Sequence, residues 1–195
     1  MIRLFTAFCK TILENLSDEM IFNDETDKYQ HHNERCPNCG STGNLAPYCS
    51  YSRNCVYHKD GKNIDARVSP LRFKCDSCGK THALLPDVLI PYSPYSLSFI
   101  LTVMIAYFQR DTTVVNICER FEIAVSTIYE WKKRLLLHKE LMLGLLISRK
   151  TPALAFLQGL LNSKSISDSL HRFFRKYDFS FLQNHSSITT KIYPP

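Results

Sequence analysis

The chain has 195 residues, of which 45% are hydrophobic, and carries a formal net charge of +6. This length and apolar content are sufficient to bury a core. The longest apolar run, Leu97 to Phe108, covers 12 residues and includes Ser98 and Thr102, whereas a membrane-spanning helix needs about 20. No secretory signal is recognisable at the N-terminus, so the eight cysteines fit a reducing compartment. We expect a soluble, cytoplasmic protein.

Residues 1–33 are predicted to form an amphipathic helix followed by an acidic linker. The helix is indicated by apolar side chains at helical spacing, namely Ile2, Phe5, Cys9, Ile12, Leu13 and Leu16. Residues 1–30 carry three Lys/Arg against six Asp/Glu, whereas residues 86–195 carry thirteen against eight. The basic excess therefore lies outside the N-terminal segment, as expected if the rest of the chain meets a polyanion such as DNA.

A five-residue pattern occurs twice in the next segment, as Cys36-Pro37-Asn38-Cys39-Gly40 and Cys75-Asp76-Ser77-Cys78-Gly79. Two residues between cysteines allow both sulfurs to reach one ion, and the following glycine allows a positive φ that turns backbone N–H groups toward the sulfurs. A redox motif or buried, unligated cysteines are the alternatives. The repetition favours one structural Zn²⁺ held by Cys36, Cys39, Cys75 and Cys78. Four protein ligands leave no position for a catalytic water.

Between the two cysteine pairs, two strand-like runs flank Asp60-Gly61, which is a hairpin turn signal. A long hairpin in this place is typical of a zinc ribbon, and we assign the ribbon to residues 34–90. Cys49, Cys55 and His58 lie inside the hairpin and are candidates for a second metal site. Alternation of Cys49, Tyr51, Arg53, Cys55 and Tyr57 along one strand face instead favours packing of the sulfurs as small hydrophobes.

After a proline-bearing connector, Ser93-Pro94 is predicted to begin a helix that runs to about Gln109. Residues 91–140 then have the layout of a helix-turn-helix. Ile117, Cys118 and Phe121 are expected to face inward from the first helix, Ile123 from the turn, and Ile128 and Trp131 from the second helix. Glu122 occupies the position usually taken by glycine, and Ala124 replaces the usual polar N-cap, so the turn is expected to be looser than usual.

The exposed face of the second helix is the candidate DNA-binding surface, made by Val125, Ser126, Tyr129, Glu130, Lys132, Lys133 and Arg134. Ser126 and Tyr129 suit base edges, whereas the three basic residues suit phosphates. An ordinary antiparallel helix pair with a solvated basic face is the alternative.

Four segments carry a resemblance to a known family: CPNCG at Cys36–Gly40, CDSCGKTHALLPD at Cys75–Asp87, PYSPYSL at Pro91–Leu97 and ICERFEIAVSTIYEWKKRL at Ile117–Leu135. Over roughly residues 34–185 the chain resembles small bacterial proteins, catalogued as a domain of unknown function, that are encoded with or related to insertion-sequence transposases. The resemblance implies a zinc ribbon joined to a helix-turn-helix that acts on DNA in mobile-element biology. No enzymatic activity is implied.

Residues 141–195 are predicted to form C-terminal helices and a tail, with a helical pair over 150–185 that packs on the helix-turn-helix or mediates self-association. Asp168 and Asp178 are the acidic residues after Glu140, too few for the carboxylates that a two-metal transposase core requires. The predicted fold class is α+β, a small β zinc ribbon followed by all-α regions.

We therefore expect a non-enzymatic, nucleoid-associated protein that binds duplex DNA, with no membrane or small-molecule substrate. The alternatives are an adaptor that docks a separate transposase or polymerase subunit, and a DNA-recognition fragment of a larger transposase.

Overall fold

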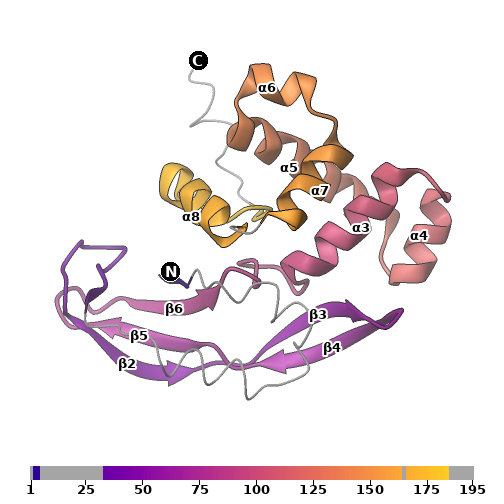
Figure 1. The fold of residues 1–195 in the computed structure, drawn as a ribbon. Coiled ribbons are helices and arrows are strands. Elements are labelled where there is room, and N and C mark those ends of the chain that lie inside the picture. The colour runs from indigo at the N-terminus through magenta and orange to yellow at the C-terminus, as the bar shows by residue number, and fades with distance from the viewer. Residues whose placement is uncertain (1, 5–32, 164–165, 185–195) are drawn as a thin grey trace. The chain divides into compact units, whose positions relative to one another are not determined.

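The computed structural model describes residues 2–4, 33–163 and 166–184. A small, mostly antiparallel β region precedes a series of helices (Figure 1), which confirms the predicted α+β class. The chain divides into two compact units. The β unit comprises the described residues up to Leu89 together with Pro94–Ser96, and the helical unit comprises Ile90–Ser93 and the described residues from Leu97 onward.

The main sheet of the β unit has the strand order β1-β6-β5-β2. Its strands are β1 (Ile2–Leu4), β2 (Leu45–Ser50), β5 (Leu71–Cys75) and β6 (Thr81–Pro86). The central strand β5 is antiparallel to β2 and β6, while β1 runs parallel to β6. One face covers a core formed by Ile2, Cys36, Leu45, Phe73, Cys75 and Leu84. Two of these six buried residues, Cys36 and Cys75, are cysteines of the CxxCG motifs, so these motifs form part of the hydrophobic core.

The predicted hairpin between the cysteine pairs is present as β3 (Arg53–Lys59) and β4 (Lys62–Val68). At its tip Asp60 and Gly61 have φ values of 51° and 77°, the positive pair that a two-residue type I′ turn requires. Buried Cys55, Tyr57 and Val68 pack with Leu85, Val88 and Leu89 in a second core.

Three sequence-based expectations for this unit are corrected. Ile2–Leu4 is a strand paired with β6, so the predicted N-terminal helix does not begin at Ile2; the rest of that prediction, with the acidic linker up to residue 32, lies outside the described residues. Cys49 and Cys55 do not share one strand face, because β2 ends at Ser50 and pairs with β5, whereas β3 pairs with β4.

The third correction concerns the start of the first long helix. Pro94 does not begin it, because Pro94–Ser96 lies along β3 instead: Val56 N donates to Pro94 O at 2.7 Å and Ser96 N donates to Val56 O at 2.9 Å. The helix α3 therefore begins at Leu97.

The helical unit contains α3 (Leu97–Gln109), α4 (Val114–Phe121), α5 (Val125–Leu143), α6 (Leu145–Lys150), α7 (Ala153–Asn162) and α8 (Ile166–Tyr177). The rings of Phe121 on α4 and Trp131 on α5 both meet Phe99 on α3 edge to face. α7 contacts α3 and α5, and Tyr177 Oη of α8 donates to Leu141 O of α5, so both C-terminal helices pack on the preceding helices. None of the described helices is long and apolar enough to cross a membrane.

The turn between α4 and α5 is tight, contrary to the expectation of a looser one. Glu122 has φ 51° and ψ 46°, a left-handed conformation that costs a residue with a Cβ roughly 1–2 kcal/mol. Its N–H caps α4 by donating to Cys118 O and Glu119 O. Of the predicted inward residues, Ile117, Phe121, Ile123, Ile128 and Trp131 are buried, whereas Cys118 is only half-buried.

His138 on α5 is fully buried within an aromatic cluster. Its ring lies 5.3 Å from the rings of Phe173 and Phe179 and 5.6 Å from that of Phe181. Leu182 N donates a 2.8 Å hydrogen bond to His138 Nδ1, which fastens the segment after α8 to α5. Burial, assisted by the positive charge of Arg134, lowers the pKa of His138 from 6.5 to about 3.

We predict that Glu122→Gly stabilises the protein by about 1 kcal/mol, because glycine adopts the left-handed conformation without steric cost. The matched control is Glu119→Gly, which places glycine in the interior of α4 and should destabilise by about 1 kcal/mol. Urea denaturation followed by far-UV circular dichroism measures both. A destabilised Glu122→Gly variant would contradict the role given to this turn.

We predict that His138 makes the helical unit sensitive to acid. The folded state keeps the ring neutral down to a pH of about 3, whereas the unfolded chain binds the proton below its ordinary pKa of 6.5. Protonation of His138 alone should therefore lower the free energy of unfolding by about 1.4 kcal/mol for each unit by which the pH is decreased between these limits.

The test compares the pH dependence of urea midpoints between the wild type and His138→Gln, which should lose this part of the slope. His171→Gln, at an exposed position on α8, should keep it. Equal slopes for the wild type and His138→Gln would refute the assignment.

Candidate metal centre and nucleic-acid interface

Four cysteines from the two CxxCG loops converge at one end of the main sheet. The Sγ atoms of Cys36, Cys39, Cys75 and Cys78 all lie within 4.8 Å of one another. Two of the separations, Cys36 to Cys78 and Cys39 to Cys75, are 3.7 Å. Sulfurs placed about 2.3 Å from a tetrahedral ion are about 3.8 Å apart, so the arrangement fits one ion held by four thiolates.

The two loops share one backbone conformation. Gly40 N donates to Cys36 O at 2.9 Å, and Gly79 N donates to Cys75 O at 2.8 Å. The second closing bond also recurs, since Cys36 N donates to Ser41 O and Cys75 N donates to Lys80 O. Both glycines have positive φ, 75° and 69°, as the pattern predicted. Each loop thus presents its two sulfurs on the same side, which is what a shared ion needs.

Two polar side chains surround the sulfurs. Ser41 Oγ lies 3.1 Å from Cys39 Sγ and 3.4 Å from Cys75 Sγ, so its hydroxyl bridges the two loops. Hydrogen bonding from Ser41 lowers the pKa of the Cys39 thiol and lowers that of Cys75 to about 6. His82 Nε2 lies 3.3 Å from Cys36 Sγ, and burial lowers the pKa of this ring. The Ser41 contacts therefore favour the thiolate forms of Cys39 and Cys75, the form that binds a metal.

The other cysteines do not extend this group. Among the described residues it is the one cluster of three or more His, Cys, Asp or Glu side chains close enough to share an ion. Cys49 is exposed, whereas Cys55 is buried in the hairpin core and burial raises the pKa of its thiol to about 11. His58 Nδ1 instead lies 3.0 Å from Asn63 Oδ1. Cys55 therefore packs as a small hydrophobe, as expected, but Cys49 does not.

The proposed DNA-facing residues lie on the outer side of α5. Val125 is 43% exposed and Tyr129 48% exposed, and Ser126, Glu130 and Lys133 are exposed as well. The polar N-cap is absent, as the sequence indicated, because Ala124 makes no side-chain hydrogen bond to the first turn. The N-terminal turns of α5 thus leave both backbone N–H groups and side chains available to another molecule.

The three basic residues predicted for phosphates have different surroundings. Lys132 Nζ donates to Tyr107 Oη at 3.0 Å and lies 5.8 Å from the centre of the Tyr129 ring. Arg134 is partly buried, and its Nε has no hydrogen-bond partner among the described residues. Lys133 is exposed. The charge most available to a phosphate is therefore that of Lys133.

Sequence reasoning did not identify Ser41 or Tyr107 as parts of these sites, and it considered His82 only as a substitute ligand, a role that the four cysteines made unnecessary. Ser41 directly follows the first CxxCG loop, so its place beside the sulfurs was readable from the chain. His82 reaches Cys36 through the pairing of β5 with β6, and Tyr107 reaches Lys132 from α3. These two contacts depend on tertiary structure.

Comparison with known protein families supports the domain of unknown function that the motifs indicated, but not its association with transposases. A domain of unknown function, DUF6431, is found at residues 36–131, a span that begins at the first cysteine of the cluster and ends at Trp131 within α5. No curated protein and no solved structure matches the chain. The match thus covers β2 to β6, α3, α4 and the first part of α5, and no function is assigned to the matched domain.

Proposed function

We propose that this protein is a non-enzymatic DNA-binding protein, transposase-associated or regulatory, in which one structural Zn²⁺ holds the β unit and α5 reads duplex DNA. The observation that carries the proposal is the exposed N-terminal face of α5, presented after the left-handed turn at Glu122. A three-residue turn between α4 and a longer second helix is the arrangement by which helix-turn-helix proteins place a helix in the major groove.

The chemistry of this face supports contacts with bases. Ser126 and Tyr129 have hydroxyl groups that donate to or accept from base edges, and Val125 offers an apolar contact for a thymine methyl group. Glu130 accepts from the amino group of cytosine. The four side chains occupy the first two turns of α5, where a recognition helix makes its base contacts.

The cations nearby support binding to phosphates. The exposed Lys133 side chain can reach toward a DNA phosphate. Lys132 is instead oriented by its hydrogen bond to Tyr107, and its ammonium group lies over the Tyr129 ring. Lys132 therefore serves both to position Tyr129 and to provide charge. Arg134 contributes less, because its side chain is partly buried and its reach toward a phosphate is restricted.

Zinc is the metal that the four-cysteine donor set fits best, because tetrahedral thiolate sites without an open position are typical of structural Zn²⁺. In small peptides such binding contributes about 10–16 kcal/mol. The ion has a structural role and takes part in no chemical step. A cytoplasmic, nucleoid-associated location follows from the proposed DNA binding.

A second candidate function is an adaptor that docks a transposase or polymerase subunit. It is favoured by α6, where the consecutive residues Leu145, Leu146 and Ile147 are 51%, 77% and 58% exposed. Exposed apolar residues that adjoin one another are common at protein–protein contacts. The same observation is compatible with the chain acting as the DNA-recognition part of a larger transposase.

For DNA binding we predict a strong dependence on salt. If at least three phosphates are neutralised, log K against log salt concentration should have a slope of about −3 or steeper. Fluorescence anisotropy with labelled duplexes of several sequences, titrated at four salt concentrations, measures it. Lys133→Ala should weaken binding to every duplex and reduce the slope by about 1, whereas Ser126→Ala and Tyr129→Ala should change the preference among duplexes.

Lys150→Ala is the matched control, since Lys150 is exposed on α6 and lies outside the α5 face. It should leave affinity and preference unchanged. A response that does not vary with salt, or an equal loss in Lys150→Ala and Lys133→Ala, would rule out the proposed interface. Capture of a transposase or polymerase subunit by a protein without DNA affinity would favour the adaptor.

For the metal we predict one zinc per chain, measured by inductively coupled plasma mass spectrometry. Cys36→Ser and Cys78→Ser should each release it and unfold the β unit, because each removes one of the four ligands. The far-UV helical signal should largely remain, since the helices belong to the other unit.

Cys49→Ser provides the matched control, because Cys49 is exposed and outside the cluster. It should retain one zinc and the wild-type stability. Two zinc ions per chain, or a metal-free wild type with a fully folded β unit, would be incompatible with this assignment.

A further inference from the structure

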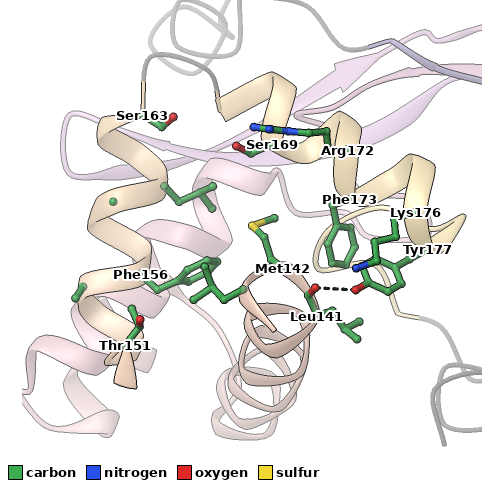
Figure 2. A pocket seen from close by; sticks show the side chains of 14 residues that line it. Leu141, Met142, Thr151, Phe156, Ser163, Ser169, Arg172, Phe173, Lys176 and Tyr177 are labelled. Carbon is green, nitrogen blue, oxygen red and sulfur yellow. Dashed lines mark hydrogen bonds between the residues drawn. The ribbon is translucent and has the colours of Figure 1, made fainter. Parts of the chain in front are cut away.

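The helical unit contains a pocket that the proposed DNA-binding function does not use. It has a volume of about 580 Å³ and lies between the C-terminal end of α5, α7 and α8. Figure 2 shows Phe156 of α7 and Phe173 of α8 on opposite sides, with Met142 of α5 between them. Pockets that bind small organic molecules commonly enclose about 300–1,000 Å³ and have mainly apolar walls. The dimensions and walls of this pocket are of that kind.

Gly159 leaves one wall of the pocket open. It lies in the interior of α7, where glycine costs roughly 1 kcal/mol relative to alanine. A Cβ added at this position would meet nothing within 4 Å, so close packing does not require glycine here. The missing side chain instead leaves space beside Leu160 and Phe156.

The rim of the pocket is cationic. Arg172 and Lys176 stand one helical turn apart on α8, both exposed and both lining the opening. Lys176 Nζ lies 5.1 Å from the centre of the Tyr177 ring, and Tyr177 Oη donates to Leu141 O at 2.7 Å, which ties this wall to α5. None of the described residues that line the pocket is acidic. An anionic group at the rim therefore meets two positive charges without an opposing carboxylate in the lining.

We infer that this pocket binds a small amphipathic acid, a molecule with an apolar body and a single anionic head group. The body lies against Met142, Phe156 and Phe173, and the head group contacts Arg172 and Lys176. Charge complementarity favours an acid over a neutral or cationic molecule of the same shape. This inference does not depend on DNA binding, and its test requires no DNA.

The test uses decanoate as the probe, with 1-decanol as the uncharged analogue of equal chain length, both titrated into the full-length protein by isothermal calorimetry below micelle-forming concentrations. Decanoate should bind about tenfold more tightly than decanol. Gly159→Leu should abolish binding of both by filling the pocket, whereas Gln158→Leu, exposed on α7 and outside the lining, should bind as the wild type does.

The charge is tested separately on α8. The double variant Arg172→Gln/Lys176→Gln should bind decanoate and decanol equally, whereas Arg175→Gln, exposed on the same helix but not in the lining, should keep the preference for decanoate. Far-UV circular dichroism should show that each variant is folded before its binding is compared. Unchanged decanoate binding by folded Gly159→Leu, or equal affinity of the wild type for the two probes, would overturn the inference.

Two further outcomes would also overturn it. Binding to phosphatidylglycerol vesicles without binding of free decanoate would identify a lipid surface as the anionic partner. A wild-type dimer that becomes monomeric in Gly159→Leu, measured by analytical ultracentrifugation, would identify a second copy of the chain as the occupant.

Discussion

The convergence of four thiols from two separate loops is the constraint on which the β unit depends. Cys39 and Cys75 are separated by 35 residues in the chain, yet their sulfurs are 3.7 Å apart. Cys36 and Cys75 also belong to the small core with Phe73 and Leu84. Thiolates packed this closely repel one another unless a cation lies between them. The core and the metal site are therefore one structure, and a core this small has little apolar area to offset that repulsion.

The parts of the fold that could be predicted are those encoded over a few residues. Asp60-Gly61 requires only a local turn, and the apolar periodicity of α7 and α8 is visible in the sequence. The errors came from contacts between distant segments. Ile2 pairs with Leu84, which favours a strand over the helix that local spacing suggested. Val56 hydrogen-bonds to the main chain of Pro94–Ser96, and α3 therefore begins at Leu97 and not at Pro94.

The candidate sites divide in the same way. CxxCG spacing identified the four cysteines because the loop geometry needs only five residues. The outward positions of α5 followed from helical periodicity, but the separate surroundings of Lys132 and Lys133 did not, since Tyr107 comes from α3. The pocket was not predicted, because its walls come from three helices. In the sequence alone, Gly159 indicates only a residue of low helix propensity.

The Pro94–Ser96 segment along β3 limits which edge of the hairpin is available for pairing with another molecule. Pro94–Ser96 occupies the outer edge of β3 through main-chain hydrogen bonds, so among the described residues β4 provides the remaining unpaired edge of this two-stranded sheet. That edge strand carries the exposed charged residues Lys62, Asp65 and Arg67. A strand from another chain would have to pair beside these charges, which disfavours edge-to-edge aggregation of the hairpin.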